Sequence, residues 1–346
     1  MKIALYSDVH WMTTSSIISG RGSKYSLKLE NLIQSVNWAE KEAVNQGCSE
    51  IICLGDFFDR SNITGEEITS LKDVEWANIP HSFLVGNHEA STKDLRYNTT
   101  NVLKNLGFNV IEKPSLRMIG DLAVINIPYL QDDIRKSINE YRKDFNVANG
   151  RCVVLSHNDV KGIQMGFFLS KEGIDIDDIR KNCDLFLNGH LHNGSKFSDN
   201  GINLGNLTGK TFEEDGFKYK HCLYVLDTDT LGITAIENPF AYNFYKLSID
   251  SEAELTSDKI HQLKNAVVVI KCEESLKSSV DSVLTESENI KVSKVVVYRK
   301  LADLTEDVTT ILNNEDHLKQ FGIFAVNQYG ADPILMEEID HIIGGN

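Results

Sequence analysis

Side chains able to bind metal ions occur at five places in the sequence, each directly after a short apolar run. The donors are carboxylates, an amide and imidazoles, with no thiolate among them. Mixed nitrogen and oxygen ligands suit Mn²⁺, Fe²⁺ or Zn²⁺ better than Mg²⁺, which prefers oxygen. There are too many donors for one ion, whereas two ions sharing a carboxylate form a clamp suited to phosphate esters. The residues are Asp8 and His10, Asp56 and Asp59, Asn87 and His88, His157, and His190 and His192.

The apolar runs before these residues are typical of buried strands. Residues 50–54 are the clearest example, bounded by polar residues and followed by Gly55-Asp56. A single aspartate after a strand is more often a turn or cap residue. Five such strand ends favour a ligand-binding role over a turn or cap, because the carboxyl ends of parallel strands meet along one rim, where open α/β sheets bind ligands. The other four predicted strands cover residues 2–7, 81–85, 152–155 and 184–187.

Helical spacing of apolar residues predicts helices over 26–46, 66–76 and 132–145, the first capped by Ser26 and ended by Gly47. Near Asn238-Pro239 the pattern changes to a short alternation of strands and helices. We therefore expect three regions: a large α/β domain over 1–238, a small α/β unit over 239–300, and an acidic, helical segment over 301–346.

The chain has 346 residues and a formal net charge of −15, and residues 301–346 carry nine acidic side chains against one basic side chain. A negative charge argues against nonspecific nucleic-acid binding, but an acidic tail can serve a protein partner instead. The six cysteines form no CxxC pair, and we find neither a signal peptide nor an apolar run near the ~20 residues of a membrane span. We therefore expect a cytoplasmic protein with reduced thiols and no membrane contact.

The motifs resemble the five signatures of the calcineurin-like metallophosphoesterases. These are Asp8-x-His10, Gly55-Asp56-x-x-Asp59, Gly86-Asn87-His88-Glu89, His157 and Gly189-His190-x-His192. The last motif, with Gly205-Asn206 and Thr211-Phe212-Glu213-Glu214, resembles the SbcD-type nuclease subunits of bacteria and phages. The motif resemblance covers about residues 1–230. It implies an α/β fold, a metallophosphoesterase β-sandwich flanked by helices, with a small α/β capping domain over 239–300 and a helical C-terminal segment.

Carried over by motif, the resemblance implies a role for each candidate residue. Asp8, His10 and His192 would hold one ion, and Asn87, His157 and His190 the other. Asp56 would bridge them, because a two-oxygen anion can join and partly neutralise two dications. His88 would lie over the scissile phosphate as a general acid or charge stabiliser, and Asp59 would orient a ligand histidine. The two divalent ions are expected to be Mn²⁺, with Mg²⁺ as the alternative.

The nuclease resemblance implies 3′→5′ exonuclease and endonuclease activity on single- and double-stranded DNA ends, a homodimer, and an SbcC-type coiled-coil ATPase partner. The chain has no Gly-x-x-x-x-Gly-Lys-Ser/Thr loop, so the ATPase would be another polypeptide, docked by residues 301–346. A phosphoprotein phosphatase or a small-molecule phosphodiesterase is the alternative, since Glu89 and Arg60 also fit protein phosphatase motifs. A non-catalytic scaffold is a third reading, which the complete ligand set disfavours.

Overall fold

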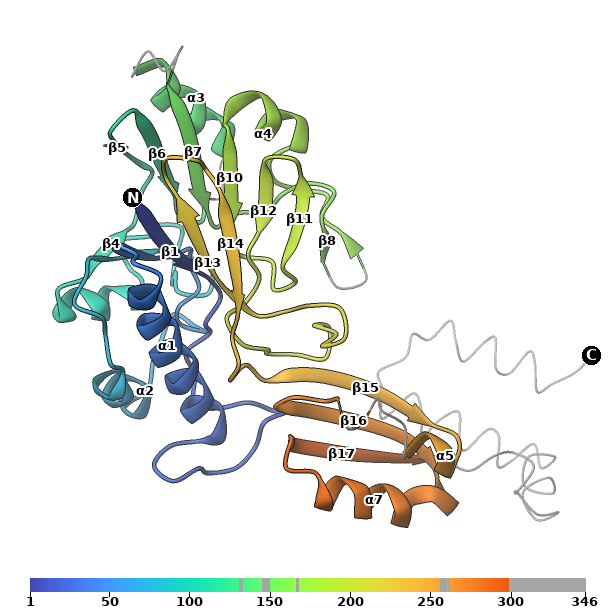
Figure 1. Ribbon diagram of the computed structural model, residues 1–346. Helices are drawn as coiled ribbons and strands as arrows, with labels where there is room; N and C mark the ends of the chain where they lie inside the picture. Colours follow the sequence, from blue (N-terminus) through green and yellow to red (C-terminus); the bar gives the residue numbers. More distant parts are fainter. Residues whose placement is uncertain (131–132, 145–149, 166–167, 256–259, 261, 299–346) are drawn as a thin grey trace, which may run out of the picture. The chain divides into compact units, whose positions relative to one another are not determined.

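Two six-stranded sheets dominate the computed structural model, which describes residues 1–130, 133–144, 150–165, 168–255, 260 and 262–298 (Figure 1). In the first sheet the neighbouring strands β1 to β4 are parallel, β13 is antiparallel to β1, and the edge strand β14 is antiparallel to β13. Its order is β14 (Ile233–Glu237), β13 (Cys222–Asp227), β1 (Lys2–Tyr6), β2 (Glu50–Cys53), β3 (His81–Leu84) and β4 (Asn109–Ile111).

The second sheet contains the other two strands that precede ligand candidates. Its order is β11 (Ser195–Ser198), β12 (Gly201–Asn203), β10 (Leu185–Asn188), β7 (Arg151–Ser156), β6 (Leu122–Ile127) and β5 (Ser115–Ile119). Strands β6, β7, β10 and β12 are parallel, and β5 and β11 are antiparallel edges. The expectation of a single rim was therefore wrong: three of the five strand ends belong to one sheet and two to the other.

The two sheets face each other across a shared apolar core. On β1, Ile3 and Leu5 contribute to this core together with Val153 and Leu155 of β7. The alternate residues of β1 lie in a second core on the other face of the sheet, as the two-residue period of a strand requires. Fully burying one such aliphatic side chain stabilises the fold by about 1.5–3 kcal/mol. The predicted α/β sandwich flanked by helices is confirmed.

Helices cover the outer faces of the sandwich. The apolar face of α1 (Leu27–Asn45) packs against the first sheet, and α3 (Ile134–Asp144) and α4 (Ile176–Asn182) pack against the second (Figure 1). Ser26 Oγ accepts a hydrogen bond from Leu29 N–H over 3.2 Å, so the predicted cap of α1 is confirmed. The expected helix over 66–76 is shorter: α2 (Gly65–Ser70) continues as a 3₁₀ turn, η1 (Leu71–Asp73). A second 3₁₀ segment, η2 (Thr99–Leu106), precedes β4, and the short strands β8 (Gln164–Met165) and β9 (Phe168–Leu169) form a hairpin.

The chain divides into two compact units. The first contains both large sheets and comprises Met1–Lys246, His261–Val269 and Ser287–Ser293. The second comprises, among the described residues, 247–255, Ile260, Ile270–Glu286 and 294–298, and includes α5 (Glu252–Leu255), η4 (Glu274–Leu276) and α7 (Lys277–Glu286). A three-stranded sheet has the order β15 (Asn243–Ile249), β16 (Ala266–Glu273) and β17 (Ile290–Tyr298).

A separate domain over 239–300 stays a prediction, and the helices expected over 301–346 lie outside the described residues. No helix in the described part of the chain is long and apolar enough to cross a lipid bilayer.

Candidate metal centre

Backbone hydrogen bonds join the loop after β1 to the loop after β2. The N–H of Asp8 donates to Gly55 O over 3.1 Å, and the N–H of His10 donates to Asp56 O over 3.0 Å. Asp8, His10 and Asp56 have φ angles of 52°, 51° and 50°, and His190 has 75°. Left-handed conformations of such residues cost of order 1–3 kcal/mol each and collect at functional sites. Backbone strain is thus concentrated where ligand candidates lie.

Two glycines allow the loops to approach this closely. A Cβ atom at Gly55, where φ is 100°, would lie 2.3 Å from His157 Nδ1. A Cβ atom at Gly86 would lie 2.0 Å from Asp56 Oδ1. Both distances are far below van der Waals contact, so the two glycines are required for the side chains to converge.

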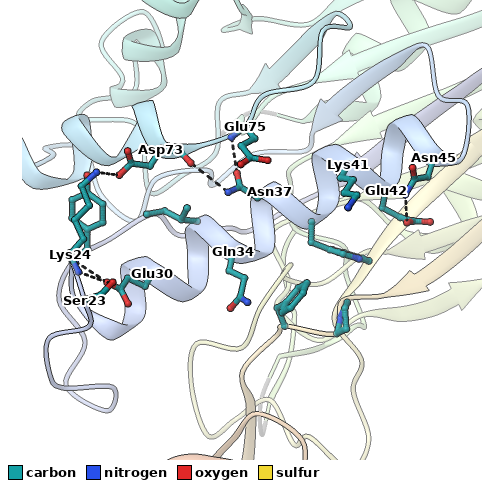
Figure 2. Close-up of a pocket in the computed structure, with 15 residues that line it drawn as sticks. Ser23, Lys24, Glu30, Gln34, Asn37, Lys41, Glu42, Asn45, Asp73 and Glu75 are labelled. Atoms are coloured by element: carbon teal, nitrogen blue, oxygen red, sulfur yellow. Dashed lines mark hydrogen bonds and ion pairs between the residues drawn. The ribbon is translucent and has the colours of Figure 1, made fainter.

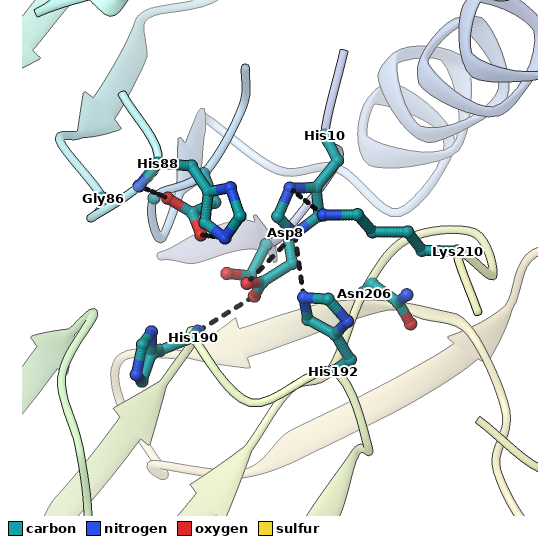
Figure 3. A network of polar contacts seen from close by, with 12 residues as sticks. Asp8, His10, Gly86, His88, His190, His192, Asn206 and Lys210 are labelled. Atoms are coloured by element: carbon teal, nitrogen blue, oxygen red, sulfur yellow. Dashed lines mark hydrogen bonds and ion pairs between the residues drawn. The ribbon is translucent and has the colours of Figure 1, made fainter. Parts of the chain in front are cut away.

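Asp8, His10 and His192 form the first group of ligand candidates (Figure 3). His10 Nε2 lies 2.9 Å from His192 Nε2 and 3.9 Å from Asp8 Oδ1. Asp8 Oδ2 accepts the N–H of His190 over 3.0 Å, which ties this group to the loop after β10. Asp8 and His10 are fully buried, so these polar atoms have no access to bulk water.

Asn87, His157 and His190 form the second group, beside Asp56. Asn87 Oδ1 lies 3.2 Å from His157 Nε2 and 2.9 Å from His190 Nδ1. Asp56 Oδ2 lies 3.3 Å from His157 Nε2. All seven predicted metal ligands therefore come together, with Asp56 in contact with the second group and clustered with His10 and His88.

Each ligand histidine has an outer partner on its second ring nitrogen. His10 Nδ1 lies 3.1 Å from Asp59 Oδ1, and His192 Nδ1 lies 3.0 Å from Glu214 Oε1. His157 Nδ1 lies 2.6 Å from the carbonyl oxygen of Leu54, and His190 Nε2 lies 3.2 Å from Asp159 Oδ1. Such partners fix the ring orientation and the tautomer and direct the other nitrogen into the site. Asp59 thus lies beside the second ring nitrogen of His10, and its orienting role stays a prediction.

His88 is the most accessible ring of the site, with 36% of its side chain exposed. Its Nδ1 lies 2.8 Å from the carbonyl oxygen of Asp59 and donates there. Its Nε2 lies 3.9 Å from Asp56 Oδ2, and its N–H donates to Asp56 Oδ1 over 3.0 Å. The ring is therefore oriented by the backbone and faces both the ligand set and solvent.

Burial and neighbouring charges shift the acid–base equilibria of the site. Burial alone raises the pKa of Asp56, but the charge and hydrogen bond of His157 outweigh it and lower that pKa to about 2. Burial lowers the pKa of His157, and the Asp56 carboxylate more than compensates, raising it to about 9. Burial and the charge of Lys210 hold the pKa of His10 well below its usual value. Without cations, an ionised Asp56 therefore lies beside a protonated His157.

Two observations test whether these residues suit divalent cations. Asp8 Oδ1 has no hydrogen-bond partner among the described residues, although its side chain is fully buried. An unpaired buried carboxylate oxygen is costly unless a cation compensates it. His10 Nε2 and His192 Nε2 face each other, and two imidazole lone pairs in that position repel unless a proton or cation lies between them. The donor set therefore fits divalent metal ions.

Three polar residues at the site carried no clear sequence signal. Asp159 follows His157 by two positions, Lys210 contacts His10 and Asp59, and Lys28 of α1 is buried beneath the loop that carries Lys210. No local spacing indicates them, because their contacts join distant segments. Glu214 is different, since the nuclease-type motif at 205–214 already singled it out.

Glu89 and Arg60, the residues that supported the phosphatase alternative, have structural contacts. Glu89 is fully buried and accepts the N–H groups of Phe58 and Gly86 over 3.0 and 2.7 Å. Burial and the charge of Asp56 raise the pKa of Glu89 to about 7. The guanidinium of Arg60 binds both oxygens of Glu67 over 2.6 and 2.8 Å. Glu89 is therefore buried away from solvent, and two of the three guanidinium nitrogens of Arg60 are occupied by Asn62 O and Glu67.

A groove of about 690 Å³ runs along α1, and none of its lining residues is a ligand candidate (Figure 2). Its polar groups are largely paired with each other. Lys24 Nζ lies 2.6 Å from Asp73 Oδ2, and Glu30 Oε1 accepts the Ser23 hydroxyl over 3.0 Å. The groove is therefore separate from the metal centre and carries none of its chemistry.

A family model described as calcineurin-like phosphoesterase matches residues 1–203, and the chain belongs to that family. Proteins of this family are phosphoesterases that use two divalent metal ions, in agreement with the groups of histidine and aspartate found here. The match includes the residues after β1, β2, β3, β7 and β10, and thus every ligand candidate.

Solved structures similar to this chain include an archaeal phosphodiesterase, 15% identical, covering 68% of this chain and 99% of that chain with a TM-score of 0.37. The phosphoesterase YfkN from Bacillus subtilis is 12% identical, with coverages of 68% and 88% and a TM-score of 0.39. A dimetal phosphatase from Danio rerio is 12% identical, with coverages of 65% and 91% and a TM-score of 0.42. The comparison with curated protein sequences gave no match.

Proposed function

We propose that this phosphoesterase is a two-metal-ion DNA nuclease, acting as 3′→5′ exonuclease and endonuclease on DNA ends. It would be the small subunit of an SbcCD-like recombination and repair complex. Mn²⁺ is the expected metal, with Mg²⁺ as the alternative, because the donor set mixes imidazole nitrogen with carboxylate and amide oxygen.

The observation that carries this proposal is the position of Glu214. Its Oε1 contacts His192 Nδ1 over 3.0 Å, and its Oε2 accepts Asn206 Nδ2–H over 2.9 Å. Asn206 and Glu214 belong to the segment 205–214, which together with Gly189-His190-x-His192 resembles the nuclease branch of the family, although Asn206 stands where that branch has serine. Their convergence on a metal-ligand candidate supports the view that this part of the motif belongs to the catalytic centre.

When bound, the two ions would supply Lewis acidity and a hydroxide nucleophile near neutral pH. Asp8, His10 and His192 would hold one ion, Asn87, His157 and His190 the other, and Asp56 would bridge them. The chain's own contribution is orientation and proton transfer. His88 donates a hydrogen bond from Nδ1 to the carbonyl oxygen of Asp59, which leaves Nε2, 3.9 Å from Asp56 Oδ2, on the side of the ligand set. From there a protonated Nε2 can donate to the leaving oxygen of a phosphodiester.

Incubation of the purified full chain with linear duplex and single-stranded DNA, with Mn²⁺ or Mg²⁺, tests the proposal. We expect metal-dependent cleavage that Asp56→Asn abolishes. Hydrolysis of an aryl phosphomonoester without cleavage of DNA would favour the phosphatase alternative. Arg60 and Glu89, the residues that supported this alternative, make contacts within the protein instead.

The partner is a further part of the proposal. A coiled-coil ATPase of the SbcC type would bind the acidic segment 301–346, and the nuclease would act as a homodimer. We expect removal of residues 301–346 to abolish co-purification with the ATPase while metal-dependent cleavage is retained. Unchanged co-purification would exclude this docking role.

A further inference from the structure

Lys210 places a cation beside the ligand histidines (Figure 3). Its Nζ lies 2.7 Å from Asp59 Oδ1 and 3.1 Å from His10 Nδ1, and 19% of its side chain is exposed. The lysine therefore borders both the buried ligand set and solvent. We propose, resting on the phosphodiesterase function proposed above, that Lys210 binds the non-bridging oxygens of the scissile phosphate.

The hydrogen-bonding capacity of Lys210 supports this role. For His10 Nε2 to offer a lone pair to a cation, its Nδ1 must carry the ring proton, and Asp59 Oδ1 lies 3.1 Å from that nitrogen. The contact between Lys210 Nζ and His10 Nδ1 is then not a hydrogen bond, since both atoms are donors. Lys210 Nζ forms an ion pair with Asp59 Oδ1 over 2.7 Å, and in the described part of the chain no other acceptor contacts the ammonium, whose N–H groups can therefore reach an anionic ligand.

The backbone fixes the position of Lys210. Its N–H donates to Glu214 Oε2 over 2.7 Å, so the residue that orients His192 also holds Lys210. The preceding Gly209 donates its N–H to Tyr242 O over 3.0 Å and accepts Lys28 Nζ over 2.9 Å. A Cβ atom at Gly209 would lie 2.3 Å from Tyr242 O, so only glycine allows this close approach of the two segments. The position of Lys210 is thus fixed by the hydrogen bonds of its own backbone and of the preceding glycine.

Other cations near the site are already engaged. Arg60 binds both oxygens of Glu67, and Arg21 binds Glu66 Oε1 over 2.7 Å. Lys28 is buried with its Nζ on Gly209 O. His88 and Lys210 both contact Asp59, through its carbonyl oxygen and its Oδ1, so a phosphate held beside His88 would lie near Lys210. A lysine suits this task because its ammonium acts as a point charge on phosphate oxygens.

The test compares Lys210→Met, Lys210→Arg and Lys218→Met by calorimetric titration with inorganic phosphate, using the Mn²⁺-loaded full chain. Lys218 is a matched control, 73% exposed and 3.7 Å from Asp215. We expect Lys210→Met to weaken phosphate binding by about tenfold or more, because a charge-assisted hydrogen bond is lost. Lys210→Arg should restore most of it, and Lys218→Met should bind like the wild type. Mn²⁺ affinity, titrated separately, should not fall in any variant.

Unchanged phosphate affinity in Lys210→Met would overturn the proposal. A parallel loss of Mn²⁺ and phosphate affinity would also overturn it, because Lys210 would then only position His10 and Asp59. If Lys210→Met does not fold, Lys210→Gln, which keeps a donor for Asp59, takes its place. A wild-type chain that binds phosphate through Lys210 but cuts no DNA would refute the nuclease function and leave this role of Lys210 standing.

Discussion

The carboxylates of Glu67 and Asp8 are both fully buried, but their oxygens are bonded very differently. Glu67 lies in α2 and accepts hydrogen bonds from Thr13, Thr64 and Arg60, at distances between 2.6 and 3.1 Å. Asp8 has a left-handed backbone, one oxygen on the N–H of His190, and the other without a hydrogen-bond partner. A complete set of donors marks a structural carboxylate, whereas an unpaired oxygen on a strained backbone marks one prepared for a ligand.

The largest effect is expected at His88, whose removal should lower the rate of hydrolysis without lowering the affinity for metal ions. His88→Ala should lower phosphoester hydrolysis by about 10²–10³-fold, because a positioned proton donor is removed. Its Mn²⁺ affinity should stay near that of the wild type, because the seven predicted ligands remain in place although His88 clusters with His10 and Asp56. Steady-state hydrolysis and metal titration of the same preparation measure both quantities. An equal loss of metal affinity would make His88 a ligand instead.

Removing an outer partner should have a smaller effect. Glu214→Gln should weaken Mn²⁺ binding by about 10–100-fold, because the carboxylate that orients His192 becomes a neutral amide. The neighbouring Glu213 is exposed, and Glu213→Gln is the matched control. Metal titration measures the Mn²⁺ affinity of both variants, and equal affinities would contradict the account.

Substitution of the structural carboxylate, Glu67, should change the stability of the fold but not the affinity for Mn²⁺. Glu67→Gln places an amide donor against the donors of Thr13, Thr64 and Arg60, at a cost of about 2 kcal/mol. Glu66→Gln removes only the partly exposed pair with Arg21 and should cost under about 1 kcal/mol. Urea unfolding of the metal-free variants measures the free energies. Loss of Mn²⁺ affinity in Glu67→Gln would remove the distinction between the two regions.

The raised pKa of His157 predicts a pH-dependent metal affinity. The folded, metal-free chain keeps His157 protonated up to about pH 9, because the charge of Asp56 favours the imidazolium. Since a metal ion binds only the neutral ring, Mn²⁺ affinity should rise about tenfold per pH unit between pH 7 and 8, with release of a proton. The stability that this pair adds to the metal-free chain is full below pH 6.5 and is lost toward pH 9. Calorimetry at two pH values is the measurement, and a pH-independent affinity would contradict it.

The ligand set could be predicted from the sequence because each member follows its strand by a few residues. Asp8, Asp56 and His157 all stand directly after apolar runs, so short-range spacing identifies them. The assignment of strands to two sheets could not be predicted in this way. Strands buried on both faces show no alternation that would reveal which sheet covers them.

Contacts between residues far apart in the sequence could not be predicted from the sequence either. Lys210 meets His10 and Asp59 across most of the chain, and Asp159 meets His190 on another strand end. Arg60 fitted a phosphatase motif by its type alone, and only its contact with Glu67 shows that it is engaged elsewhere. Residue type and spacing predict which side chains enter a site, but the partners that orient them depend on the three-dimensional fold.

The most direct test of the central claim is the number of metal ions that the ligand set binds. Calorimetric titration of the metal-free full chain with Mn²⁺, in wild type and Asp56→Asn, measures it. The account predicts two ions per wild-type chain and loss of at least one tight site in Asp56→Asn, because the shared carboxylate is gone. Equal binding by both proteins, or no binding by the wild type, would contradict it.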